Sequence, residues 1–299
     1  MSPPSPASSS SEGRPRARPA GPVVVGVLSH RDAPLLRRLV DRLLDGEETV
    51  VLVHHDPRGP ELDLPRSDRV LLARSPVECR WGRPSLARAV LGTATEARDR
   101  VPELSWFLLV SGQDYPCRPI GDIERELASN DADAYLRWFE VPTVPGADEH
   151  PWQAVTRRRY LHRRRLPRSH RSLPLPRRHP FDQRTPLVVG DMWVNLGRRA
   201  LDHLIEQRAR RPELERYLMT CSVPDEAVVT TLLHDGAEGL RVVGDRRRYI
   251  RWVQGEAHPA VLGLQDLEAI STGGDFFARK VDGDLSRPLL DALDARAQR

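Results

Sequence analysis

Glu226 stands where a helix is predicted to begin, and this position suits a general base. It follows Pro224-Asp225, and apolar residues then repeat at helical spacing between Val228 and Leu233. The dipole of a helix stabilises a negative charge in its first turn, and the helix holds the side chain rigidly. A base that takes a proton from a hydroxyl needs this fixed geometry and a suitable pKa. A glutamate beside a capping aspartate is also a common helix start, so the spacing leaves a structural role open.

A basic pair, Arg279-Lys280, follows two phenylalanines. Lys280 is the only lysine among the 46 Lys and Arg residues of the chain. Adjacent cations anchored by aromatic side chains are suited to neutralise a departing diphosphate without a metal ion. A lone lysine in an arginine-rich chain also indicates a position that needs a compact ammonium. The alternative is an ordinary solvated basic pair.

Polar residues also follow two apolar runs that are predicted to be strands. Asp114 comes after Trp106–Val110, and His54, His55 and Asp56 end an earlier run. Ligands bind at the carboxyl ends of parallel strands, so Asp114 is a candidate hydrogen-bond partner for a sugar. Asp114 equally fits a turn before a proline. Consecutive histidines in a strand point to opposite faces and do not share one metal ion, so one of them is expected to be structural.

Two Asp-x-Asp sequences, Asp131–Asp133 and Asp282–Asp284, match a pattern with which many nucleotide-sugar transferases hold a divalent metal ion. A working pair normally follows an apolar strand, whereas the first pair here precedes its strand. The second pair encloses a glycine and fits a surface turn. Both are interpreted as turns, and no metal site is predicted.

The segment Arg157–Arg178 reads RRRYLHRRRLPRSHRSLPLPRR. Such a charge run could contact the phosphates of nucleic acid or an anionic lipid. Tyr160 is its only aromatic residue, and no nucleic-acid recognition motif is present, which makes nucleic-acid binding the weaker interpretation. The alternative is a solvated loop over an active site.

The elements that must position these residues alternate between strands and helices. Strands are predicted at Val23–Leu28, Thr49–Val53, Arg69–Ala73, Trp106–Val110, Ala134–Phe139, Trp193–Leu196 and Arg248–Val253, with helices between most of them. This alternation predicts an α/β fold with a mostly parallel central sheet. Residues 1–22 are expected to be a disordered Pro/Ser-rich leader, 23–290 a single domain with an arginine-rich insertion near 141–186, and 291–299 a tail.

The composition excludes several classes of protein. The 299 residues are 39% hydrophobic with a net charge of +4, so the chain can bury a core and is not a histone-like wrapper. Its three cysteines lack a CxxC spacing, which argues against a disulfide scaffold or a zinc ribbon. No signal peptide or membrane span is evident, so we expect a cytoplasmic protein that is at most peripheral to a membrane.

Several segments in order resemble the core-2/I-branching β-1,6-N-acetylglucosaminyltransferases, a family that also contains peptide O-xylosyltransferases. The resemblance covers roughly residues 23–284. The segments are Val23–His30, His54-His55-Asp56, Arg80-Trp81-Gly82 with Ser85, Leu109–Pro116, Val223–Glu226 with Thr230 or Thr231, Tyr249–Trp252, His258-Pro259 and Phe277–Lys280. Each motif is weak alone, and their shared order carries the resemblance.

The resemblance implies a GT-A-like fold and inverting transfer from a UDP-sugar to a hydroxyl, with no metal or other cofactor. The family's catalytic base falls on Glu226. The implied donor-binding residues are His54, Asp56, Arg80, Asp114, Arg279 and Lys280. Trp193 and Trp252 are expected to line the acceptor site, and Arg251 and His258 to contact the diphosphate or to be structural. Animal members are Golgi membrane proteins with disulfides, which this sequence does not match.

The sequence thus predicts a soluble, bacterial-type glycosyltransferase that uses UDP-GlcNAc and acts on the hydroxyl of a glycan, glycolipid, peptide or small molecule. One alternative is transfer of xylose from UDP-xylose. Another is a nucleic-acid- or anion-binding protein that works through Arg157–Arg178. A degenerate sugar-binding module is a third, which the presence of both Glu226 and Lys280 disfavours.

Overall fold

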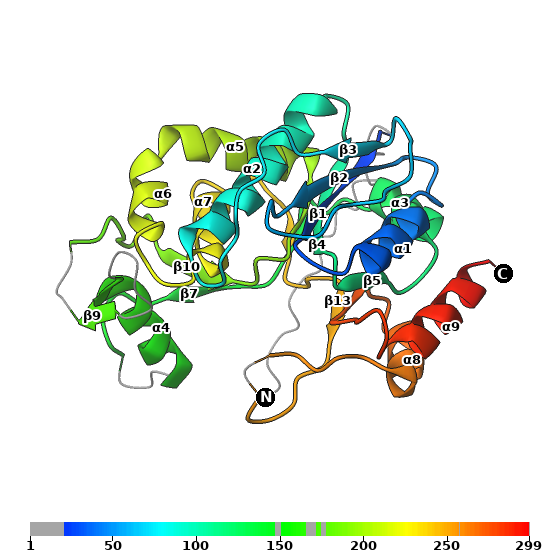
Figure 1. Ribbon diagram of the computed structural model, residues 1–299. Coiled ribbons are helices and arrows are strands. Elements are labelled where there is room, and N and C mark those ends of the chain that lie inside the picture. Colours follow the sequence, from blue (N-terminus) through cyan, green and yellow to red (C-terminus); the bar gives the residue numbers. More distant parts are fainter. Residues whose placement is uncertain (1–20, 147–150, 166–171, 175–177, 257, 299) are drawn as a thin grey trace, which may run out of the picture.

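A seven-stranded sheet forms the centre of the protein, which we describe from a computed structural model (Figure 1). The structure describes residues 21–146, 151–165, 172–174, 178–256 and 258–298. The strand order is β12-β6-β11-β4-β1-β2-β3. The strands are β1 (Val23–Ser29), β2 (Thr49–His55), β3 (Val70–Leu72), β4 (Trp106–Ser111), β6 (Ala134–Tyr135), β11 (Asn195–Gly197) and β12 (Val242–Val243).

Most neighbours in this sheet are parallel, as predicted. The strands β4, β1, β2 and β3 run parallel, and only β11 runs antiparallel to its two neighbours. All seven residues of β1 are buried, because helices cover both faces of the sheet. Alternate residues of β1 therefore enter different hydrophobic clusters, with Val24 on one face and Val25 on the other.

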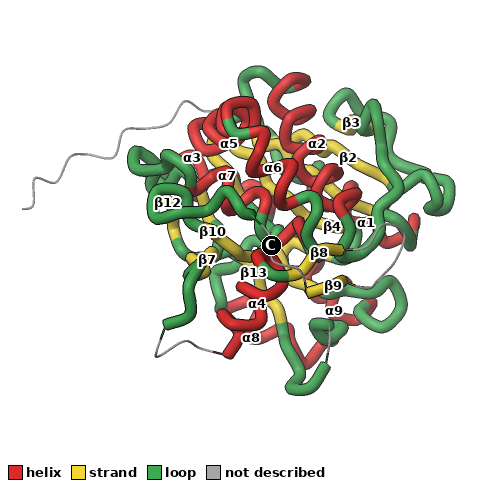
Figure 2. The backbone as a smooth tube through the Cα atoms, turned by 90° about the vertical axis from the view of Figure 1, so that its left-hand side faces the viewer, coloured by secondary structure: helices red, strands yellow, loops and turns green. Residues whose placement is uncertain are grey.

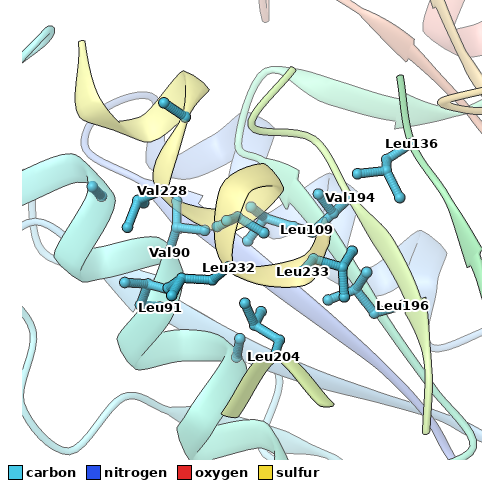
Figure 3. Close-up of a cluster of buried hydrophobic side chains, with 14 of the residues drawn as sticks. Val90, Leu91, Leu109, Leu136, Val194, Leu196, Leu204, Val228, Leu232 and Leu233 are labelled. Atoms are coloured by element: carbon cyan, nitrogen blue, oxygen red, sulfur yellow. The ribbon is translucent and has the colours of Figure 1, made fainter. Parts of the chain in front are cut away.

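One face is covered by α2 (Pro84–Arg100), α5 (Arg198–Arg210) and α7 (Val228–His234). Figure 3 shows the leucines and valines of these helices packed against β4 and β11. A side chain at Gly26 in β1 would collide with Thr93 of α2 and with Phe107, so this glycine allows the close approach of helix and sheet. This packed core fixes α7, the helix that follows Glu226.

The opposite face is covered by α1 (Ala33–Leu43), α3 (Ile120–Ser129) and α9 (Arg287–Ala297). Asp32 caps α1 by accepting a hydrogen bond from the Leu35 amide at 3.1 Å. The remaining helices are α4 (Pro151–Leu161), α6 (Pro212–Leu218), α8 (Leu267–Thr272) and the 3₁₀ turns η1 (Pro224–Glu226) and η2 (Leu264–Asp266). Nowhere in the described chain is a helix both long and apolar enough to span a membrane.

A second, three-stranded sheet lies beside the first. Its strands are β5 (Asp114–Pro116), β13 (Arg248–Ile250) and β14 (Phe277–Arg279), in the order β13-β14-β5. Arg279 is registered against Asp114 across the antiparallel pair. This sheet brings charged residues from distant parts of the sequence together.

The interruption predicted near 141–186 contains regular structure. Here α4 follows β7 (Trp138–Val141), and a hairpin of β8 (Arg163–Arg165) and β9 (Ser172–Pro174) precedes β10 (Leu187–Gly190), which pairs with β7. Figures 1 and 2 show α4 and this hairpin projecting from the body beyond β7 and β10. Tyr160 of α4 is fully buried and donates a hydrogen bond to the Val223 carbonyl at 2.7 Å, which ties the helix to η1.

Several predicted boundaries were wrong. The strand expected at Ala134–Phe139 is divided between β6 and β7, which belong to different sheets, and the leader falls largely outside the described residues. Helix α2 begins after Arg83, which makes no capping hydrogen bond, and the Ser85 hydroxyl accepts from the Arg80 amide at 3.0 Å.

The tail predicted at 291–299 is also wrong, because α9 runs through residue 297. Leu289, Leu290 and Leu293 bury one side of α9 in the core. Asp294 accepts hydrogen bonds from Tyr115 at 2.6 Å and from Arg38 at 2.7 Å. The helix therefore supports β5, which carries Asp114.

Replacing Leu290 with alanine is expected to lower the free energy of unfolding by about 2–4 kcal/mol, because it opens a cavity in the core. Urea denaturation measures this change. Leu285→Ala is the control, since Leu285 is exposed and its loss is expected to cost less than about 0.5 kcal/mol. If both substitutions leave the free energy of unfolding almost unchanged, α9 does not pack as described.

Candidate active site

A buried carboxylate, Asp114, joins two arginines at the carboxyl end of β4. Its Oδ1 accepts from Arg248 at 2.8 Å and its Oδ2 from Arg279 at 3.3 Å. The Ser111 amide also donates to Oδ2, at 2.8 Å. Asp114 has no exposed surface, so the predicted direct contact with a sugar does not fit this structure. The carboxylate can influence a ligand only through the two guanidinium groups.

Trp193 completes this cluster. Its ring centroid lies 3.8 Å from the guanidinium carbon of Arg279 and 5.0 Å from that of Arg248. Burial lowers the pKa of Arg279 to about 10, so the side chain remains a cation at neutral pH. Two guanidinium groups thus face one carboxylate, and the cluster carries surplus positive charge.

Lys280 extends the positive charge toward the surface. It is half-buried, and no described residue forms an ion pair with it. Burial lowers the pKa of the Lys280 ammonium, and the charges of Arg279 and Arg31 lower it further. Arg31 follows β1, so three cations from distant segments gather where β1, β4 and β14 end. Such a group favours a polyanionic ligand.

His54 and Asp56 organise the segment that leads to Arg80. The Nε2 of His54 accepts from the Val77 amide at 3.0 Å, and Asp56 accepts from the Cys79 amide and from Arg58, both at 2.7 Å. The ion pair with Arg58 holds the pKa of Asp56 well below its usual range. Both side chains are buried and position the backbone beside Arg80.

His55 has a structural role, as we expected for one of the two consecutive histidines, His54 and His55. It bonds the Ser29 hydroxyl through Nδ1 at 2.6 Å and the Pro60 carbonyl through Nε2 at 2.9 Å. The two histidines therefore hold different loops.

The Arg80-Trp81-Gly82 turn connects this region with η1. Gly82 has a φ of +66°, a conformation that favours glycine, and its carbonyl accepts from the Val223 amide at 3.1 Å. Trp81 is exposed and lies edge-on to His258, with ring centroids 6.4 Å apart. The predicted donor loop is thus hydrogen-bonded to the turn that carries Glu226.

Glu226 is paired with an arginine from α4. Its Oε2 accepts from Nη1 of Arg159 at 2.9 Å, and its side chain is 41% exposed. Partial burial raises the pKa of Glu226, and nearby Asp191 also raises it, whereas Arg159 lowers it. The carboxylate is therefore held in place, remains accessible, and is easier to protonate than an ordinary glutamate.

The neighbouring Asp225 is enclosed. It is 5% exposed, and among the described residues its Oδ1 has no hydrogen-bond partner. Burial raises the pKa of Asp225 to about 7, and the charge of Glu226 adds to this effect. Asp225 is thus partly protonated at neutral pH.

Comparison with protein families identifies the chain. The model of the Core-2/I-Branching enzyme family matches residues 27–272, most of the sequence. The chain belongs to this family. It is therefore a glycosyltransferase with an α/β fold of the GT-A-like kind, and it uses a nucleotide-sugar donor and an acceptor. A search of curated proteins found no match.

Three further residues predicted for this branching-family enzyme, Arg251, Trp252 and His258, follow β13 in the sequence. Arg251 donates to Asp266 at 2.7 Å, which is the structural role that the sequence left open. Trp252 is largely exposed, and His258 is exposed beside Trp81. Trp193 was expected near an acceptor, but it packs on Arg279 and Arg248 in the cationic cluster.

Three functional candidates were not predicted as such: Arg31, Arg248 and Arg159. Each of these arginines interacts with a charged residue that is distant in the sequence. Asp133 was correctly interpreted as structural, since it is buried and accepts from Arg199 and from the Arg241 amide, both at 3.0 Å. Within the residues that the structure describes, no three His, Cys, Asp or Glu side chains form a group suited to a metal ion.

Replacing Asp225 with asparagine should reduce the pH dependence of stability. An aspartate with a raised pKa stabilises the fold below about pH 4, its value when unfolded, and loses that contribution as the pH rises toward 7. Between pH 5 and pH 8 the wild type should therefore lose about 2–3 kcal/mol more than Asp225→Asn, measured by urea denaturation at each pH.

Asp284→Asn is the control, because Asp284 is almost fully exposed. It should retain the wild-type pH dependence. An unchanged pH dependence in Asp225→Asn would show that Asp225 ionises normally.

Proposed function

We propose that this enzyme transfers GlcNAc from UDP-GlcNAc to an acceptor hydroxyl, with inversion and without a metal ion. Glu226 is the general base, and the cations Arg279, Lys280 and Arg31 face the diphosphate. The observation that carries the proposal is the place of Glu226: its carboxylate is held by Arg159 at 2.9 Å, its side chain is 41% exposed, and its turn is hydrogen-bonded to the Arg80–Gly82 loop through the Val223 amide. The charge of Asp191 raises the pKa of both Glu226 and Arg279.

The cations supply what the leaving group requires. Negative charge grows on the diphosphate as the bond to the sugar breaks, and preorganised cations stabilise it without a metal ion. Lys280 is half-buried, whereas Arg279 is buried between Asp114 and Trp193. The buried cluster thus provides a constant positive field, and Lys280 provides the direct contact.

The reaction follows from these positions. Glu226 takes the proton from the acceptor hydroxyl, the oxygen attacks the anomeric carbon, and the bond from that carbon to UDP breaks. Arg159 favours the ionised form of Glu226, because its positive charge opposes the effect of burial on the pKa. A donor panel that includes UDP-xylose distinguishes GlcNAc transfer from xylose transfer.

Replacing Glu226 with glutamine should lower kcat by roughly 10²–10⁴-fold while UDP still binds, because the amide cannot take the proton. The assay is UDP release from a panel of nucleotide sugars, with EDTA present throughout. Lys280→Ala is the matched variant: it should weaken UDP binding by about tenfold or more, since a charged hydrogen bond is lost. Wild-type turnover in Glu226→Gln contradicts the assignment of the base, and loss of turnover in EDTA contradicts metal independence.

Replacing Arg159 with glutamine should move the acidic limb of the pH profile of kcat/KM to higher pH, by about 0.5–1 pH unit. The base must be ionised to act, and removal of the neighbouring cation raises its pKa. Arg125→Gln is the control, because Arg125 is exposed on α3. If the limb does not move, Arg159 does not tune the base.

A further inference from the structure

Four large apolar side chains between residues 139 and 155 are exposed. Phe139, Val144, Trp152 and Val155 are between 38% and 71% exposed. The rings of Phe139 and Trp152 lie 5.4 Å apart, so β7 and α4 contribute to one surface. The guanidinium of Arg137 lies 5.7 Å from the Phe139 ring. Single exposed apolar residues are ordinary, but two aromatic rings in contact with exposed valines nearby mark an interaction surface.

Helix α4 buries one side and exposes the other. Its buried side carries Arg157, Tyr160 and Leu161. Trp152, Val155 and Arg158 recur at intervals of three residues and are all exposed, so they form one stripe. Tryptophan and arginine are side chains that favour the interface between lipid and water. We call Phe139, Val144, Trp152, Val155 and Arg158 the α4 face.

The sequence around this face is strongly basic. By sequence, residues 137–186 contain twelve arginines and four acidic residues, Glu140, Asp148, Glu149 and Asp182. Of the described side chains next to Phe139 and Trp152, Arg137 and Arg158 are exposed, and so is Glu140. A second copy of the chain would bring the same positive charge against itself. Nucleic acid would match the charge but would leave the valines uncovered. An anionic lipid surface matches both the charge and the apolar side chains.

We propose that the α4 face docks this protein on an anionic lipid surface. The inference stands apart from the glycosyl transfer reaction, since it rests on exposure and charge alone. Its consequence for the enzyme is direct, because α4 also carries Arg159, which is bonded to Glu226. Docking through α4 would place the candidate base beside the lipid surface.

Flotation of the full-length protein with lipid vesicles tests the proposal. Vesicles of phosphatidylcholine with 30% phosphatidylglycerol should bind the protein, and pure phosphatidylcholine vesicles should bind it much less. The double variant Trp152→Ser, Val155→Ser should partition at least about tenfold more weakly, and Arg158→Ala about fivefold more weakly. Leu72→Ser is the control: Leu72 is also exposed, and β3 lies at the other end of the molecule from α4 (Figure 1). Thermal melting confirms that each variant is folded.

The outcomes separate the possible partners. Anion-dependent binding that is lost in the double variant and kept in Leu72→Ser supports the proposal. Equal binding to both vesicle types, or equal loss in Leu72→Ser, overturns it. It is also overturned if the α4 face instead binds single-stranded RNA more tightly than vesicles, or if sedimentation shows a dimer that the double variant abolishes.

Discussion

Asp114 carries a negative charge in a place that water does not reach, and residues of β4, β13 and β14 are arranged around it. A buried charge is tolerated only when partners and hydrogen bonds replace its hydration. Arg248, Arg279 and Ser111 do this from β13, β14 and the end of β4. The small sheet holds these residues in register, and α9 supports it through the bond between Asp294 and Tyr115.

The same cluster explains how a static fold prepares for a charged substrate. One carboxylate satisfies two arginines only in part, so positive charge remains, and Lys280 and Arg31 add to it. Around Glu226 the charges balance, because Glu226 and Asp191 are paired with Arg159 and Arg246. The cationic cluster thus carries a net positive charge, whereas the charges around Glu226 cancel. This separation suits a reaction that removes a proton at one end and releases an anion at the other.

Local patterns in the sequence predicted much of the fold and part of the site. The β-branched run at Val23 and the strand at Trp106 are buried on both faces, so their apolar runs were unambiguous. Helix α4 was missed because apolar and basic residues occur on both of its sides: Trp152 and Val155 are exposed, whereas Arg157 is buried with Tyr160. The roles of Arg248 and Arg159 were also hidden, since their partners lie 134 and 67 residues away. Long-range pairing of charges has no local signature.

The ion pair between Asp114 and Arg279 joins residues 165 positions apart. A ribosome adds about 5–20 residues per second, so roughly 10–30 s separate the synthesis of the two partners. Until Arg248 is made, 134 residues after Asp114, the carboxylate has neither arginine, and β5 has no neighbouring strand until β14 is made. A nascent chain can therefore form the β1–β4 core while this cationic cluster is still incomplete. The order of synthesis thus delays activity until β13 and β14 have emerged.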